Sequence, residues 1–92
     1  MQFDLSLAIE FRSIGADVWQ SGYTEKIGSN RIQFRSLEPV PPSSEIEMVF
    51  HMPVADPCRV ECIGKVLEVC SPNKIGAPLV ISASIERYSF VR

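Results

Sequence analysis

The sequence predicts an all-β protein, a small antiparallel β-barrel of six strands. Apolar and polar residues alternate with period two in several segments, and clusters of Pro, Gly, Asn and Ser separate these segments. No segment shows the 3.6-residue period of an amphipathic helix. Short strands between such turns are typical of sandwiches and barrels, and six strands in 92 residues favour a barrel because closure removes exposed edges.

The first predicted strand, Phe3 to Arg12, has the clearest alternation in the chain. Residues 15–17 read as a turn. The second predicted strand runs from Val18 to Ile27, and Gly22 within it indicates a β-bulge. Residues 28–30 form the next predicted turn, since Gly, Ser and Asn tolerate positive φ.

The third predicted strand is Arg31 to Ser36, and the loop after it contains three prolines, which cannot donate to a sheet ladder. The fourth is Glu45 to Met52. The fifth, Cys58 to Cys70, is long, and its apolar face switches near Gly64, as a bulge or a barrel bend would cause. The sixth is Leu79 to Tyr88. The last residues either finish this strand or form one short turn.

The alternating faces predict which side chains fill the barrel. The residues expected mostly inside are Phe3, Leu5, Leu7, Ile9, Phe11, Ile32, Phe34, Ile46, Met48, Phe50, Ile81 and Ile85.

Three cysteines, Cys58, Cys62 and Cys70, are predicted to be buried, reduced thiols. All three fall in one predicted strand, where residues four apart lie about 13 Å from each other. A disulfide needs Cα atoms within about 7 Å, so Cys58 and Cys62 are not expected to bridge. A zinc site would need a fourth ligand such as His51, and the spacing matches no common zinc motif. No metal site is expected.

Composition indicates a single packed domain spanning residues 1–92, with 46% hydrophobic residues. The formal net charge of −2 and the scattered Lys and Arg residues argue against a nucleic-acid binder. Neither a secretory signal nor a run of about 20 apolar residues is visible, so we expect a cytoplasmic protein that does not enter a membrane.

An enzyme is not expected, and no catalytic residue or cofactor is assigned. His51 is the one histidine, and it reads as an ordinary strand residue. Glu45 and Glu47 share an outward strand face, where charges usually serve solubility and edge protection. A glycine-rich phosphate loop is missing.

The stretch from Gly22 to Phe34 resembles the hairpin of PilZ domains, small β-barrels known as receptors for cyclic di-GMP. In that family the hairpin carries Asp/Asn-x-Ser-x-x-Gly, followed by an apolar-x-Phe pair. The matching residues here are Lys26, Gly28 and Arg31, followed by Ile32 and Phe34. The frame is therefore kept, while all three ligand-reading positions are changed.

The resemblance covers nearly the whole chain. Segments that resemble the later strands and the ending of the family are Glu45 to Phe50, Cys62 to Leu67 and Ile85 to Phe90. The family's second ligand element, Arg-x-x-x-Arg, lies on a segment before the first strand, and none is seen ahead of Phe3. Arg31 and Arg35 have that spacing, but inside a strand, so chance explains it better.

The resemblance implies a degenerate PilZ-like barrel that acts as a regulatory adaptor through a protein partner. A homodimer is an alternative form of such contact. Expected contact residues are Trp19, Tyr23, Tyr88 and Phe90. One alternative is a receptor that still binds cyclic di-GMP, through Lys26, Ser29, Asn30 and Arg31. Another is a small barrel for single-stranded nucleic acid, which the acidic composition disfavours.

Overall fold

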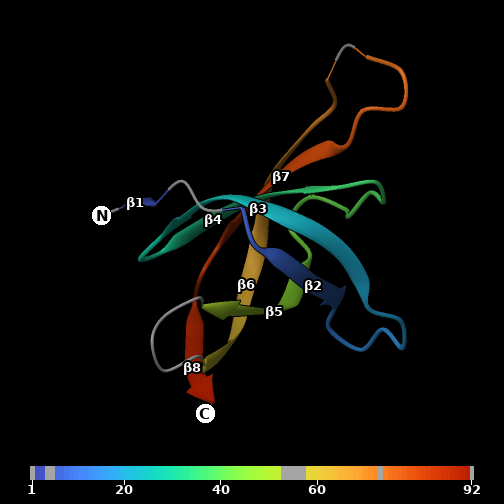
Figure 1. Cartoon of the computed structure of the whole chain (residues 1–92). Helices are drawn as coiled ribbons and strands as arrows, with labels where there is room; N and C mark the ends of the chain where they lie inside the picture. The colour runs from blue at the N-terminus through green and yellow to red at the C-terminus, as the bar shows by residue number, and fades with distance from the viewer. Residues whose placement is uncertain (1, 4–5, 53–57, 73, 92) are drawn as a thin grey trace.

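The structure is a computed structural model that describes residues 2–3, 6–52, 58–72 and 74–91. In this part of the chain eight β-strands form one antiparallel sheet (Figure 1). The strands are β1 (Gln2–Phe3), β2 (Ala8–Ser13), β3 (Gln20–Gly28), β4 (Arg31–Ser36), β5 (Glu45–Met52), β6 (Cys58–Cys70), β7 (Leu79–Ser84) and β8 (Arg87–Val91). Among the described residues, no helix is long and apolar enough to cross a membrane.

Six of these strands close into a barrel, in the order β3-β2-β5-β6-β7-β4 and back to β3. Every pairing is antiparallel. Two strands lie outside the ring: β1 extends the pairing at the end of β3, and β8 pairs with the first half of β6. The predicted six-stranded antiparallel barrel is confirmed.

The long strand β6 changes its neighbouring strand along its length. On one side it pairs with β5 from Cys58 to Lys65. On the other side it pairs with β8 up to Ile63 and with β7 from Val66 onward, which Figure 1 shows as β7 at one end of β6 and β8 at the other. Gly64 lies at this change, and a Cβ there would collide with the carbonyl oxygen of Ser84. Only glycine lets the two strands approach so closely.

Both bulges differ in position from the sequence prediction. In β6 the pairing slips between Val66 and Glu68, so the change of face follows Gly64 by a few residues. In β3 the slip lies between Thr24 and Lys26 instead of at Gly22. Gly22 has a different role, since a Cβ there would collide with the carbonyl oxygen of Arg35.

The first two predicted strands begin differently in the structure. Residues 2–3 and Ala8–Ser13 are separate strands, and Asp4 and Leu5 lie outside the described residues. Leu7 still lies against β3, because its amide donates to Thr24 Oγ1 at 2.8 Å and its carbonyl accepts from the Thr24 amide at 2.8 Å. Val18 precedes β3 and is 73% exposed.

The prediction of one strand from Leu79 to Tyr88 is wrong. Strand β7 ends at Ser84, and two backbone hydrogen bonds then divert the chain. The Ile85 amide donates to the Asn30 carbonyl at 2.9 Å, and the Glu86 amide donates to the Ile63 carbonyl at 2.9 Å. The chain therefore leaves β4 and continues along β6 as β8, neither finishing the strand nor forming a turn.

The predicted core is largely confirmed. Eight of the named side chains are buried: Ile9, Phe11, Ile32, Phe34, Ile46, Met48, Phe50 and Ile81. Leu7 and Ile85 are partly buried against them, and the side chains of Phe3 and Leu5 lie outside the description. The rings of Phe11 and Phe34 pack with centroids 4.8 Å apart at the centre of the barrel.

The three cysteines are free thiols, but only one is buried. Cys62 lies in the core, Cys58 is half-buried, and Cys70 is exposed, so the prediction that all three are buried is wrong for the two strand ends. Burial raises the pKa of Cys62 to about 11. At Cys70 the hydrogen bond to Glu68, at 3.2 Å, raises the pKa of the thiol.

Replacing Gly64 by alanine should destabilise the fold strongly, since the new methyl group meets the backbone of β7 rather than a side chain that can turn away. We expect a loss of about 3 kcal/mol in the free energy of unfolding, measured by urea denaturation. The control is Gly76→Ala, at φ +80° in open space, which should cost about 1 kcal/mol. Equal losses for the two variants would contradict the close approach at Gly64.

Cys62 should make the fold less stable at alkaline pH. The unfolded chain loses the thiol proton near the ordinary pKa of 9.0, whereas the folded chain keeps it up to about 11. The unfolding free energy should therefore fall by about 1.4 kcal/mol per pH unit between these values, with no such contribution below pH 9. Urea denaturation of the wild type and of Cys62→Ala at pH 8 and 10 isolates this slope. Identical slopes would show that the thiol ionises equally in both states.

Candidate interaction site

The four residues predicted for ligand contact lie together on the β3–β4 hairpin. Lys26 is near the end of β3, Ser29 and Asn30 form the turn, and Arg31 begins β4. All four are exposed. The hairpin thus presents two cations and two small polar side chains on its outer surface.

The bulge in β3 places a carboxylate beside these cations. Glu25 is the extra residue, and it accepts a hydrogen bond from Gln33 Nε2 at 3.1 Å and pairs with Arg35 Nε at 2.8 Å. Burial raises the pKa of Glu25, but the bonds from Gln33 and Arg35 and the charges of Arg35 and Lys26 outweigh it and lower the pKa overall. Arg35 is therefore engaged inside the hairpin.

A second group of exposed residues lies on β8. Tyr88 and Phe90 are each 59% exposed, and their rings meet edge to face with centroids 5.6 Å apart. In register they stand opposite Cys62 and Val60 of β6, whose side chains are buried in the barrel. The two rings therefore extend the apolar inner face of the sheet beyond the closed barrel.

An apolar hollow of about 270 Å³ connects β8 with the hairpin. The residues that line this apolar hollow are Ile27, Gly28, Ser29, Phe50, Met52, Val60, Cys62, Ile85, Tyr88 and Phe90. Its walls are mainly carbon, with Ser29 at the hairpin side. Such a hollow suits an apolar side chain, whereas a phosphate would find no charged group among its lining residues.

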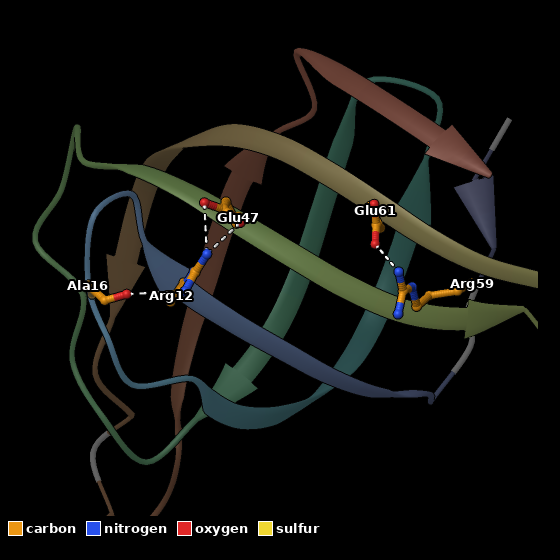
Figure 2. Close-up of polar contacts among 5 residues, drawn as sticks. All are labelled: Arg12, Ala16, Glu47, Arg59 and Glu61. Carbon is orange, nitrogen blue, oxygen red and sulfur yellow. Dashed lines mark hydrogen bonds and ion pairs between the residues drawn. The ribbon is translucent and has the colours of Figure 1, made fainter. Parts of the chain in front are cut away.

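A larger groove of about 430 Å³, with both polar and apolar walls, lies on the outer face of the sheet, between Trp19 and β8. Figure 2 shows the two ion pairs at this face, Arg12 with Glu47 and Arg59 with Glu61. Arg12 donates to both carboxylate oxygens of Glu47, at 3.3 and 3.4 Å, and to the carbonyl of Ala16 at 3.3 Å. The charges of this groove are largely matched within the protein.

The structure separates the four predicted contact aromatics. Tyr88 and Phe90 form a pair, and Tyr88 and Trp19 both line the larger groove. Trp19 is partly buried, with the Arg12 guanidinium 4.4 Å from its ring centroid. Tyr23 is 63% exposed on β3 and lines neither hollow.

Sequence reasoning missed the apolar residues that complete the hollow, among them Met52 and Ile85. The alternation in the predicted strands Glu45 to Met52 and Leu79 to Tyr88 assigns both to the inner face, but it does not show that they border a hollow. Among the described residues, no three His, Cys, Asp or Glu side chains gather closely enough to hold a metal ion.

No family model matches the sequence, and no curated protein matches it. Among solved structures, the inhibitor of motility of Bacillus subtilis (MotI/DgrA) superposes on 96% of this chain with a TM-score of 0.82 and 9% sequence identity. This chain spans 42% of the length of that chain. At such low identity the likeness concerns the fold alone: the fold is a PilZ-like six-stranded β-barrel, with β1 and β8 outside the ring.

Proposed function

We propose that this domain is a cytoplasmic, PilZ-like regulatory module that acts through contact with a protein, and that tight binding of cyclic di-GMP is not part of its function. The observation that carries the proposal is the exposed pair of Tyr88 and Phe90 beside the apolar hollow. The structural neighbour is named as an inhibitor of motility, which supports a regulatory role.

Exposed aromatic rings next to an apolar hollow are typical of protein contact surfaces. Tyr and Phe are enriched at the centre of interfaces, where they pack against apolar pockets and lose little conformational entropy on binding. Here two rings lie mutually packed on one strand, and the hollow beneath them offers room for an apolar side chain of a partner. Burial of these groups would provide the driving force for association.

The hairpin offers poor chemistry for cyclic di-GMP. Lys26 presents a cation where the PilZ motif has an acceptor, Gly28 has no hydroxyl, and Arg31 replaces a glycine. Lys26 and Arg31 attract phosphate, but one charge-assisted contact contributes only about 1.5–3 kcal/mol. Micromolar affinity needs roughly 8 kcal/mol. The other nearby arginine, Arg35, is already paired with Glu25.

Titration of the protein with cyclic di-GMP by calorimetry should give a dissociation constant no tighter than about 100 μM, equivalent to roughly 5.5 kcal/mol. The matched variants are Lys26→Ala and Arg31→Ala, which change the exposed hairpin without touching the core. A low-micromolar constant for the wild type that both variants weaken would contradict the proposal and establish a receptor working through unusual residues.

The double variant Tyr88→Ala/Phe90→Ala should abolish regulation while leaving the barrel folded, because both side chains are mostly exposed. The assay is complementation of a chromosomal deletion in the source organism, with motility scored first because of the structural neighbour. Tyr23→Ala is the matched control, since Tyr23 is equally exposed but lines neither hollow. We expect the control to complement fully. Full complementation by the double variant would show that regulation does not need the β8 surface.

A further inference from the structure

Strand β8 is an edge of the sheet. Among the described residues it pairs with β6 along one side, and no described strand pairs with its other side. All five of its residues, Arg87 to Val91, are exposed. An edge with free amide and carbonyl groups and aromatic side chains is a template for a further strand, and β8 contains no proline or lysine to block one.

We propose that this further strand is β8 of a second copy of the chain, joined antiparallel about a twofold axis at Ser89. The inference rests on the proposed function, because it names the protein that the β8 surface contacts. A twofold interface brings the same patch of both copies together, so the strand must be complementary to itself when reversed. The sequence of β8 meets this condition in one register.

With Ser89 opposite its own copy, Tyr88 stands opposite Phe90 of the second copy, and Phe90 opposite Tyr88. The two rings of each copy already lie on one face and contact each other. Pairing would therefore join four rings into one continuous row above the two apolar hollows. Cross-strand aromatic pairs of this kind stabilise antiparallel sheets.

The length of the paired segment favours the same register. With Ser89 opposite its own copy, all five residues of β8 pair with all five of the second copy. A shift of two residues would set Tyr88 opposite its own copy and would pair only three residues of each β8.

On the other face no like charges stand opposite each other. Arg87 faces Val91 of the second copy, and the two Arg87 residues are about 13 Å apart, since four residues separate them along the strand direction. An interface built on one short edge strand belongs to the small, transient class. The expected dissociation constant is therefore in the range of about 1–100 μM.

The register is tested by charge exchange at Val91, which faces Arg87 of the second copy. Sedimentation equilibrium of the wild type between 10 μM and 1 mM should show a monomer–dimer equilibrium. Val91→Arg sets two pairs of like charges opposite each other and should weaken association at least tenfold. Val91→Glu loses the same side chain but sets opposite charges face to face, and it should associate at least tenfold more tightly than Val91→Arg. Equal association of the two variants would overturn the register.

A disulfide provides an independent test. Directly opposed residues of antiparallel strands have Cα atoms about 4.5–5.5 Å apart, within the range of a disulfide. In a Cys58→Ser/Cys70→Ser background, Ser89→Cys should form a covalent dimer under mild oxidation. The control Arg87→Cys, on the same face of the same strand, should remain largely monomeric because its own copy is too distant. Equal cross-linking of the two variants would overturn the twofold at Ser89.

The outcomes separate this inference from the proposed function. A wild type that stays monomeric at 1 mM, with no faster cross-linking of Ser89→Cys than of Arg87→Cys, overturns the homodimer. If Tyr88→Ala/Phe90→Ala still abolishes regulation in cells, the β8 surface contacts a different protein. If that variant regulates normally while the charge exchange behaves as expected, the dimer stands and the proposed function fails.

Discussion

At Gly64, β6 and the end of β7 approach each other so closely that a Cβ would collide with the carbonyl oxygen of Ser84. Without a side chain at this position, β6 exchanges one neighbour for another without leaving the sheet. From Val66 onward, β6 closes the barrel by pairing with β7. Up to Ile63, the same edge of β6 pairs with β8. This change of partner places Tyr88 and Phe90 beside the apolar hollow.

This arrangement places the exposed rings of β8 and the altered hairpin on two sides of the same hollow. Gly28 and Ser29 contribute to its hairpin side, and Tyr88 and Phe90 to the side formed by β8. The Glu25–Arg35 ion pair links the two strands of the hairpin beside the β3 bulge. We therefore propose the β8 surface as the contact site of the domain, with the hairpin forming one side of the hollow next to it.

Much of the barrel follows from the sequence because period-two alternation records which face of a strand is buried. Strands β4, β5 and β6 have the predicted bounds, and the inward residues from Ile9 to Ile81 are buried as expected. The bulges and β8 do not follow in this way, because they depend on contacts between distant segments. Nothing local to Ile85 indicates that its amide will meet the Asn30 carbonyl and turn the chain toward β6. The alternation along a strand places Tyr88 and Phe90 on one face, but their position beside the hollow depends on that change of direction, which the local sequence does not show.

Amide chemical shifts of the ¹⁵N-labelled protein distinguish a contact surface on β8 from one on the hairpin. The spectra are recorded from 10 μM to 1 mM protein and then with 20 μM cyclic di-GMP added to the dilute sample. We expect concentration to shift the amides of residues 86–91 and of the apolar hollow, while the nucleotide leaves the amides of residues 26–31 in place. Shifts at residues 26–31 with the nucleotide, and no change along β8 with concentration, would contradict this expectation.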